Sequence, residues 1–412
     1  MTIIYGALTF LVFIFIVVNI KQYRNIRTSI AFITHETRKP LRGKRQKRFI
    51  FLIPVLDEHT IIQETIAYFS RILAAHPTSR LVFITTQREG GATENKTWQH
   101  IQPHLSEQIG LIHYPLLTGN KAHQINYAVA QLQAETGEGG LPVYYAIFDA
   151  DSRPDIRGCE YIAQDTHDEK IYQMLPVYST NFARLSLLGK ASAIFQTRWM
   201  MSHELPSLLE NHRRQRAVNL SYCVGHGLFI EARYFAQHPL PTETVTEDLL
   251  FGYQAVMNHV YARPTPYFDY CSTVALFPVS VRQAARWHAG DITSLLKLMR
   301  EKNTDPRLRL LQVRRLFQML QWPFGPLLTA AALCCLLVLN CWPAVLLMLA
   351  LIGCYVCVLH CPVMKLFFRR GGNPLSLYSA LLLKSAVNCT GALYSYFLRV
   401  TPNGNLWFKT PR

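Results

Sequence analysis

Two aspartates separated by one residue, Asp149 and Asp151, follow an apolar run in the sequence. Extended backbone around alternate aspartates lets both carboxylates reach one hard cation and the phosphates that it bridges. The tripeptide alone is a weak signal, and its place directly after an expected strand strengthens it. Asp149 and Asp151 are therefore candidate ligands for a hard divalent cation.

Three further groups of residues could serve the same chemistry. Thr246, Glu247 and Asp248 precede a helical pattern, where they either start the helix or place a carboxylate that acts as a base. Lys121 opens another helical pattern, where it either meets a phosphate or is a solvated surface lysine. Asp57, in the loop after the first expected strand, either caps the following helix or belongs to the site.

Gln283, Arg286 and Trp287 fall on adjoining faces of one expected helical turn. A polar contact, a fixed cation and an aromatic platform at this spacing suit a sugar-phosphate ligand. The alternative is an amphipathic helix that lies at a membrane surface.

The elements that position these residues are expected to be parallel α/β units. Short apolar runs rich in β-branched and aromatic residues alternate with helical patterns, which predicts a parallel sheet covered on both faces. Ligands of such sheets bind at the carboxyl ends of the strands, where the residues above lie. The expected strands are residues 49–55, 81–86, 111–114 and 143–149, and the expected helices include residues 61–73 and 121–132.

Taken in order, these elements resemble the membrane-integrated family 2 glycosyltransferases, which include hyaluronan, cellulose and chitin synthases and ceramide glucosyltransferase. The resemblance covers residues 49–290. It rests on a P-x-x-N-E-like loop, a D-x-D motif, a T/E-E-D motif, a Q-x-x-R-W motif and a G-K-x-x-x-L-N-like stretch. These are carried by Pro54, Asp57 and Glu58; by Asp149 and Asp151; by Thr246, Glu247 and Asp248; by Gln283, Arg286 and Trp287; and by residues 119–126.

This resemblance implies a GT-A, Rossmann-like catalytic domain and a single inverting displacement on a nucleotide sugar. Asp248 would be the catalytic base, and Asp151 with Asp149 would hold Mg²⁺ or Mn²⁺ on the donor diphosphate. Trp287, Glu247 and His226 would contact the acceptor. The donor would be bound by Pro54, Glu58, Glu89, Lys121, Asp149, Asp151, Gln283 and Arg286.

Two departures from the family pattern bear on specificity. The family usually has an aspartate after the second strand that contacts the nucleotide base, whereas this chain offers Glu89 there. A UDP-sugar is the expected donor because uracil is the commonest base in the family. In the loop at residues 222–227, His226 replaces part of a Cys-Gly-Ser sequence typical of processive synthases, which leaves processivity open.

Composition indicates a soluble part combined with a few membrane segments. Half of the 412 residues are hydrophobic, 17% are charged, and basic residues exceed acidic ones by 16. This excludes an acidic disordered chain and leaves nucleic acid, anionic lipid or a phosphorylated substrate as partners. Seven of the ten cysteines lie in the apolar C-terminal part without zinc spacing, which fits a reducing compartment.

The first span is expected at residues 3–20, because this run contains no charge. Ten basic residues follow it, which places the N-terminus outside and the following domain in the cytosol. These residues are expected to contact anionic lipid. They are Lys21, Arg24, Arg27, Arg38, Lys39, Arg42, Lys44, Arg45, Lys47 and Arg48.

Two more spans are expected at residues 323–340 and 341–360, joined by a turn over residues 340–343. Residues 375–398 form either a fourth span or an interfacial helix, because Lys384 lies near their centre. Arg399, Lys409 and Arg412 at the end favour the interfacial helix. The expected layout is an anchor (1–20), a basic juxtamembrane linker (21–48), the GT-A domain (49–290), an amphipathic interfacial segment (291–322) and a membrane region (323–412).

The sequence therefore predicts a multi-pass membrane enzyme, in the inner membrane if the source is bacterial, that moves a sugar from a nucleotide sugar to a lipid-linked or glycan acceptor. Such an enzyme would transfer a hexose or an N-acetylhexosamine in glycolipid or polysaccharide synthesis. A processive synthase is the alternative, and with so few spans it would need a homo-oligomer to form a channel. A metal-dependent phosphotransferase and a membrane-anchored nucleic-acid-binding or scaffold protein are the remaining alternatives, although no nucleic-acid motif is present.

Overall fold

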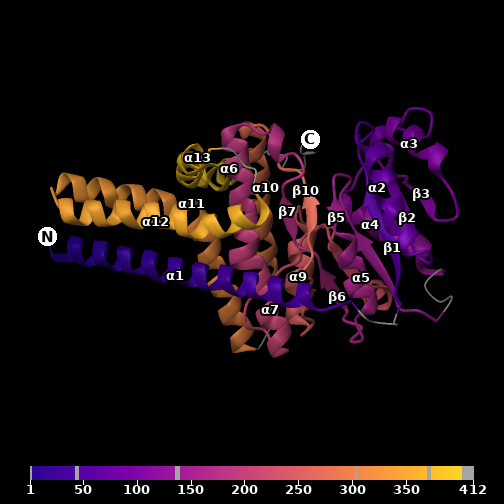
Figure 1. Ribbon diagram of the computed structural model, residues 1–412, viewed down its shortest axis with the longest axis horizontal. Coiled ribbons are helices and arrows are strands. Elements are labelled where there is room, and N and C mark those ends of the chain that lie inside the picture. The colour runs from indigo at the N-terminus through magenta and orange to yellow at the C-terminus, as the bar shows by residue number, and fades with distance from the viewer. Residues whose placement is uncertain (1, 42–45, 135–139, 302–304, 369–372, 401–412) are drawn as a thin grey trace. The chain divides into compact units, whose positions relative to one another are not determined.

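The computed structural model describes residues 2–41, 46–134, 140–301, 305–368 and 373–400, and the chain forms two compact units (Figure 1). The sheet unit comprises His35–Pro176 and Ser207–Cys271. The helical unit comprises Met1–Thr34, Val177–Pro206 and Ser272–Arg412. The expected domain over residues 49–290 is thus divided between the two units. The domain boundaries expected from the sequence stay a prediction.

The sheet unit is built on a seven-stranded sheet in the order β3-β2-β1-β4-β8-β6-β9. The four strands expected from the sequence are its first four and run parallel, whereas β8 is antiparallel to both of its neighbours. The strands are β1 (Arg48–Pro54), β2 (Arg80–Thr86), β3 (Ile109–Tyr114), β4 (Val143–Ile147), β6 (Ile171–Gln173), β8 (Leu228–Glu231) and β9 (Arg263–Pro264).

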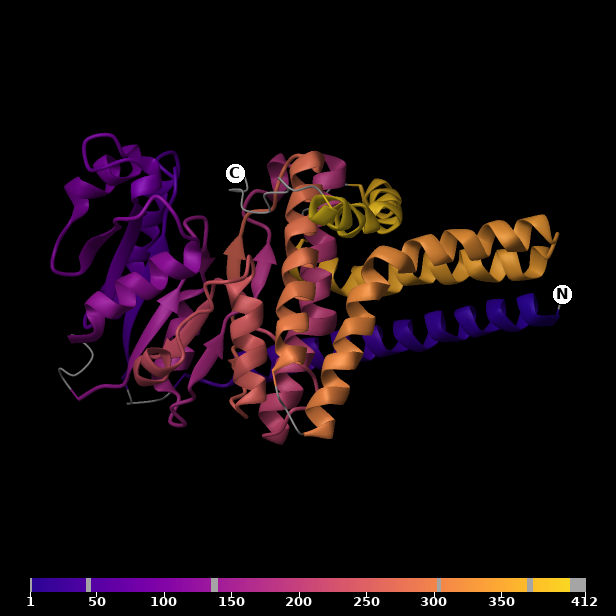
Figure 2. The ribbon, with the colours of Figure 1, turned by 180° about the vertical axis from the view of Figure 1, so that it is seen from behind.

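Helices and short segments complete this unit (Figure 2). They are α2 (Ile62–Ala75), α3 (Lys96–Ile101), α4 (Lys121–Leu132), α5 (Ile156–Gln164), α8 (Ala232–Gln237) and α9 (Glu247–Met257), the 3-10 turns η1 (Gln87–Glu89) and η2 (Gln102–His104), and the paired strands β5 (Arg153–Pro154) and β10 (Asp269–Cys271). The chain passes between the units within β7 (Pro176–Tyr178) and α7 (Leu205–Arg214).

An aromatic core holds the central strands to α2. Phe69 of α2 lies edge-to-face with Phe51 of β1 and with Phe148, at centroid distances of 5.7 and 5.5 Å. Phe148 in turn meets Phe229 of β8 at 5.7 Å, and all four side chains are fully buried. Each such side chain stabilises the fold by about 1.5–3 kcal/mol relative to exposure. This core fixes the strand ends from which the candidate site is built.

The proposed capping role of Asp57 is wrong. The residue that precedes the first turn of α2 is Ile61, and Asp57 lies in the loop before it with a φ of 54°. The carbonyl of Glu58 accepts hydrogen bonds from the backbone N–H groups of Ile61 and Ile62 instead. Asp57 is thus placed by a tight turn, at a φ that aspartate tolerates better than most residues.

The helical unit contains long helices and several short segments. They are α1 (Thr2–Arg38), the 3-10 turn η4 (Phe182–Arg184), α6 (Leu187–Trp199), the π-helical turn η5 (Met200–Glu204), α10 (Phe277–Arg300), α11 (Pro306–Val338), α12 (Trp342–Phe367), α13 (Pro374–Val387) and α14 (Cys389–Val400). In the described part of the chain, α11 and α12 are long and apolar enough to cross a membrane.

The two expected C-terminal spans lie within α11 and α12, and the connection between these helices contains Asn340 with a φ of 50°. The expected first span lies within α1 and stays a prediction, as does the orientation across the membrane. Residues 375–398 are divided between α13 and α14, whose 14 and 12 residues measure about 21 and 18 Å. Each is shorter than the ~30 Å apolar layer of a bilayer, which favours the interfacial alternative.

The basic stretch after the first span does not form a single surface. Lys21, Arg24 and Arg27 continue along α1, and Arg38 ends it. Lys47 is 1% exposed, so the expectation that it contacts lipid is wrong. Five basic residues of these predictions lie outside the described residues: Arg42, Lys44, Arg45, Lys409 and Arg412.

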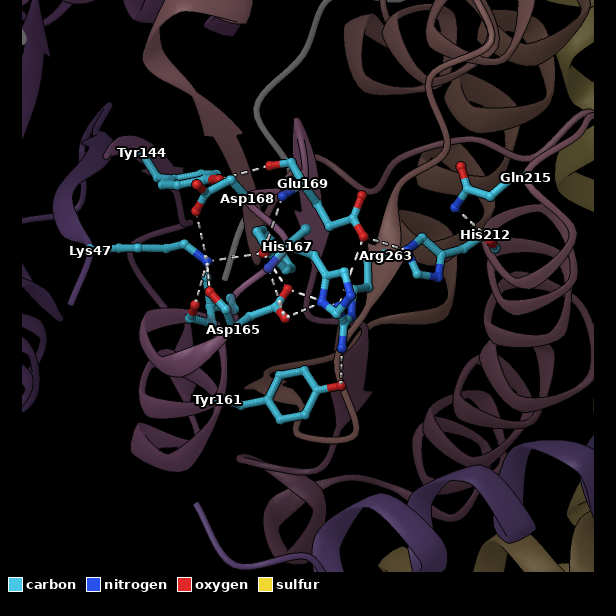
Figure 3. Close-up of polar contacts among 12 residues, drawn as sticks. Lys47, Tyr144, Tyr161, Asp165, His167, Asp168, Glu169, His212, Gln215 and Arg263 are labelled. Carbon is cyan, nitrogen blue, oxygen red and sulfur yellow. Dashed lines mark hydrogen bonds and ion pairs between the residues drawn. The ribbon is translucent and has the colours of Figure 1, made fainter. Parts of the chain in front are cut away.

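Lys47 instead occupies a buried polar cluster just before β1 (Figure 3). Its Nζ donates to the carbonyls of Ile162 and Asp165, at 2.9 and 2.7 Å, and to the Tyr172 hydroxyl at 3.1 Å. The Asp165 carboxylate accepts from Tyr172 and from Arg263 at 2.5 and 2.8 Å. Although burial favours the neutral acid, these contacts hold the pKa of Asp165 below its usual range. The cluster ties the start of β1 to the end of α5.

Replacing Lys47 with Met should destabilise the protein strongly. The substitution keeps most of the side-chain volume but leaves two carbonyls and the Tyr172 hydroxyl without their donor, which costs about 3–5 kcal/mol for a buried charged group. Thermal unfolding of the purified full chain, followed by circular dichroism, measures the effect. Lys39→Met is the control, because the exposed Lys39 ammonium bonds Glu36 at the surface and should contribute less than about 1 kcal/mol. Equal melting temperatures for the two variants would contradict the structural role of Lys47.

Candidate active site

The candidate site lies at the carboxyl edge of the parallel strands in the sheet unit. The loops that follow β1, β2 and β4 carry Asp57, Glu89 and Asp149, respectively. Parallel strands in register end at the same edge of a sheet, and the pairs Pro54 with Ile84 and Leu52 with Ile147 give that register here. The sequence expected ligand chemistry at this edge.

The ammonium of Lys121 joins two loops at this edge. Its Nζ contacts Asp149 Oδ1 at 2.6 Å and donates to the carbonyl oxygen of Gly225 at 2.7 Å. Burial alone would lower the pKa of Lys121, but Asp149, together with Glu247 and Asp248, raises it above its ordinary value. Lys121 is therefore a fixed cation among three of the carboxylates that the sequence singled out.

The turn that carries Asp149 and Asp151 is anchored through its backbone. The Ser152 amide donates to the carbonyl of Asp149 at 3.0 Å, and the Asp149 amide donates back to Ser152 Oγ at 3.2 Å. The carbonyl of Ala150 accepts from the Thr65 hydroxyl of α2 at 2.5 Å. The position of the two carboxylates is thus set by a rigid turn.

These two carboxylates fit a divalent cation that is shared with a phosphate ligand. Carboxylate oxygens are hard donors, and Mg²⁺ is typically held by one or two of them plus substrate phosphates and water. Within the described residues, no group of three or more His, Cys, Asp or Glu side chains could form a complete protein cage. The donor set therefore suits a cation that depends on its substrate for further ligands.

Asp248 lies in the first turn of α9, against the loop at residues 222–227. A Cβ placed on Gly225 would come within 2.9 Å of Asp248 Oδ2, and one on Gly252 would come within 2.2 Å of the Cys223 amide nitrogen. Glycine at these two positions thus lets the loop pack directly on α9. The Gly225 carbonyl also bonds Lys121, so the loop brings the acid and the lysine to one place.

His226 in the same loop is held by a carboxylate that the sequence did not indicate. His226 Nδ1 donates to Asp269 Oδ2 at 2.7 Å, and Ser152 Oγ donates to the same oxygen at 2.6 Å. The Asp269 side chain is fully buried and the His226 side chain is 12% exposed. Burial would lower the pKa of His226, but Asp269, with a smaller contribution from Asp149, raises it above its ordinary value.

The stretch at residues 119–126 also fixes the approach to Asp248. Asn120 caps α4, and its side-chain Nδ2 donates to the carbonyls of Thr242 and Thr244 at 3.0 and 3.2 Å. Asn126 exchanges two hydrogen bonds with the backbone of Leu240. These asparagines hold the segment that leads into α9, so residues 119–126 orient the segment before Asp248 as well as carrying Lys121.

Glu89, the expected stand-in for a base-contacting aspartate, is engaged within the protein. Its Oε2 accepts from the Asp57 amide at 2.6 Å, and its Oε1 accepts from the amide and hydroxyl of Thr97 at 3.0 and 2.5 Å. Glu89 therefore cross-links the loops after β1 and β2. Pro54 is half-buried at the end of β1, and Glu58 is 9% exposed, with its amide donating to Thr97.

Gln283, Arg286 and Trp287 lie on α10, as the helical pattern predicted, and belong to the helical unit. All three side chains are half-buried. The Arg286 Nε atom is buried without a hydrogen-bond acceptor among the described residues. A guanidinium N–H without an acceptor is a donor that remains available for an anionic ligand.

Sequence reasoning missed Asp269, Ser152 and Gln173. Gln173 Oε1 accepts a hydrogen bond from the Val224 amide at 2.9 Å, and Gln173 Nε2 donates to the His226 carbonyl at 2.9 Å. Gln173 therefore fixes the loop that carries His226. Ser152 directly follows the D-x-D motif, which was an available signal. Asp269 and Gln173 are far from the motifs in sequence, so no sequence signal pointed to them.

Comparison with known proteins adds evidence on the fold. No protein-family model matches this chain, and no curated protein matches it in sequence. The structure is similar to mannosyltransferase PcManGT from Pyrobaculum calidifontis, solved in complex with GDP-Man and Mn²⁺: the TM-score is 0.58 and the identity 13%, over 96% of this chain and 99% of that chain. Residues 1–349 of S. aureus TarS give a looser likeness, with a TM-score of 0.42 and 12% identity over 86% and 93% of the chains. The chain thus shares its mixed α/β fold with the mannosyltransferase.

The pair of His226 and Asp269 should make stability depend on pH. Because the pKa of His226 is raised on folding, its contribution to stability is fully present below the unfolded pKa of about 6.5 and is lost as pH rises through the folded pKa. The groups that set this titration are Asp269, Asp149 and Lys121. We expect the loss of melting temperature in His226→Gln to be largest near pH 5.5 and smaller near pH 8.5.

Melting curves of wild type and His226→Gln at the two pH values test this expectation. His104→Gln is the control, because His104 is exposed on η2 and its loss should change the melting temperature little at either pH. A loss for His226→Gln that is equal at both pH values would contradict the pairing.

Proposed function

We propose that this protein is a membrane-associated GT-A glycosyltransferase of family 2 that transfers a sugar from a nucleotide-sugar donor to a lipid-linked or glycan acceptor. The observation that carries the proposal is the convergence of Lys121, Asp149 and Asp248 on the loop at residues 222–227. Three motifs far apart in sequence thereby supply a cation, a metal ligand and a base at the carboxyl edge of one sheet. The strand order and the likeness to a mannosyltransferase fold support the same assignment.

In this proposal, Asp149 and Asp151 bind the cation that accompanies the donor diphosphate. When bound, Mg²⁺ or Mn²⁺ neutralises the charge that develops on the leaving nucleoside diphosphate. Lys121, paired with Asp149, supplies a further positive charge beside those phosphates. Pro54, Glu58 and the loop ordered by Glu89 complete the donor side, and Gln283 with Arg286 contact the pyrophosphate.

Asp248 acts as the general base. Its carboxylate takes the proton of the acceptor hydroxyl while that oxygen attacks the anomeric carbon on the face opposite the leaving diphosphate. The new glycosidic bond forms as the bond between the anomeric carbon and the phosphate oxygen breaks, so the anomeric configuration inverts. A positioned base of this kind typically contributes about 10²–10⁴-fold to the rate. Glu247, His226 and Trp287 contact the acceptor.

The two long apolar helices support a membrane location for this chemistry, and we propose that the enzyme is a multi-pass protein with its sheet unit in the cytosol, where nucleotide sugars occur. The small number of spans favours addition of a single sugar over extrusion of a polymer. A UDP-sugar is the donor inferred from the sequence. Since the similar mannosyltransferase was solved with GDP-Man and Mn²⁺, both UDP- and GDP-sugars belong in a test.

Asp248→Asn should abolish sugar transfer. The amide keeps the shape of the side chain but cannot take the acceptor proton, so the rate should fall by about 10²–10⁴-fold while donor binding persists. The purified full chain is incubated with radiolabelled UDP- and GDP-sugars, Mg²⁺ or Mn²⁺, and a membrane lipid extract, and labelled product is sized. Glu107→Gln, which alters an exposed carboxylate, is the control. Undiminished transfer by Asp248→Asn would refute the assignment of the base, and long product chains would refute single addition.

Gly225→Ala should impair catalysis by displacing the base. The added methyl group would lie 2.9 Å from Asp248 Oδ2, so the carboxylate must shift while the backbone can stay in place. We expect a lower kcat for transfer, a smaller loss than in Asp248→Asn, and little change in the KM of the donor. Gly91→Ala is matched to it, because no atom lies within 4 Å of the added methyl group there. Equal kcat values for the two variants would show that the loop does not position Asp248.

A further inference from the structure

The helical unit contains a buried guanidinium that has no carboxylate partner among the described residues. Arg198 lies near the end of α6 and is 1% exposed. Its nearest polar contacts are all neutral: Nη1 donates to Gln22 Oε1 at 2.5 Å and to Ser202 Oγ at 3.4 Å, and Nη2 donates to the Tyr355 hydroxyl at 3.4 Å. Among the described residues, no acidic side chain forms an ion pair with it.

The Nε–H group of Arg198 has no acceptor at all in the described part of the chain. The Nε and Nη2 atoms share one edge of the guanidinium, the edge that binds the two oxygens of a phosphate or carboxylate side by side. Nη1 is occupied by Gln22, whereas this edge has a single, long contact to Tyr355. This edge therefore carries an N–H donor whose hydrogen bond the described residues leave unmet.

A second cation lies against the same aromatic ring. The Arg198 guanidinium carbon is 4.6 Å from the centroid of Phe195, and Lys384 Nζ of α13 is 5.9 Å from that centroid. The half-buried Lys384 has no hydrogen bond or ion pair among the described residues. The pKa of nearby His203 lies well below its usual value. Burial lowers it most, and the positive charges of Arg198, Arg315 and Lys21 lower it further.

Two buried or half-buried cations beside one ring need a counter-anion, because a charge removed from water is costly unless it is paired. Within the described residues, neither cation is paired with an acidic side chain. Helix α6 packs against α12 and α13 (Figure 1), and α12 is one of the two helices apolar enough to cross a membrane. The anion that a bilayer offers to such helices is the phosphate of a lipid.

We propose that Arg198 and Lys384 bind the phosphate monoester of a membrane lipid. The phosphate oxygens would accept from Nε and Nη2 of Arg198 and from Nζ of Lys384, and the Tyr355 hydroxyl lies beside Nη2. A phosphate monoester carries up to two negative charges near neutral pH, which matches the two cations. This inference concerns a binding site in the helical unit and does not depend on the proposed transfer reaction.

Native mass spectrometry of the purified full chain in detergent micelles tests the site. Dioleoyl phosphatidic acid is the probe, phosphatidylcholine is the matched lipid without a phosphate monoester, and inorganic phosphate tests a free anion. We expect phosphatidic acid to form adducts at about tenfold lower concentration in wild type than in Arg198→Gln or Lys384→Gln, the effect of losing one hydrogen bond to a charged group. Lys190→Gln is the control, because Lys190 lies on the same helix but its ammonium contacts the ring of Phe182.

Three outcomes would overturn the proposal. Equal adducts with phosphatidylcholine would show that only the apolar chains bind, and displacement of the lipid by inorganic phosphate would indicate a free-phosphate site. Wild-type affinity in Lys384→Gln and in Arg198→Lys would show that these cations do not bind the lipid. Arg198→Lys keeps the charge and removes the Nε edge, so it remains informative if Arg198→Gln fails to fold.

Discussion

The candidate site depends on one electrostatic contact, the ammonium of Lys121 between the Asp149 carboxylate and the Gly225 carbonyl. Without a cation there, the carboxylates of the D-x-D turn and of the first turn of α9 would repel one another across a partly buried space. With it, the turn after β4, the start of α4 and the loop at residues 222–227 are held together. The close approach of Gly225 to Asp248 extends the connection to the proposed base.

Two of the lysines in the sheet unit, Lys47 and Lys121, show how differently a basic residue can be used. Lys47 is buried before β1 among two carbonyls, a hydroxyl and the Asp168 carboxylate, so its charge serves stability at the amino ends of the strands. Lys121 is 27% exposed at the carboxyl ends, among carboxylates that a substrate and its metal could engage. The helical unit adds a third case, since Arg198 is buried among neutral partners and retains an unmet donor. These three basic residues thus have different local surroundings.

Sequence reasoning succeeded where the signal lies within about a dozen residues. Continuous apolar runs located the four parallel strands, and the limits of α4 and the start of α9 followed from helical pattern and capping chemistry. It failed where neighbours in sequence are not neighbours in space. Asp57 does not cap α2, because the chain makes a tight turn first, and Lys47 does not meet lipid, because β1 draws it into the domain. Residues 375–398 read as one apolar segment, whereas the structure divides them at Asn388.

Local patterns in the sequence were enough to predict a mixed α/β fold with parallel strands and the two apolar C-terminal helices, because hydrophobic periodicity is a property of short segments. The tertiary structure alone decided which partners individual polar residues have. Asp269 holds His226 and Ser152 from more than a hundred residues beyond the D-x-D motif, Glu89 turns inward to join two loops, and Arg198 has no carboxylate partner among the described residues. The physical reason is that hydrogen bonds and ion pairs between distant segments depend on how the core packs, which no local pattern of residues records.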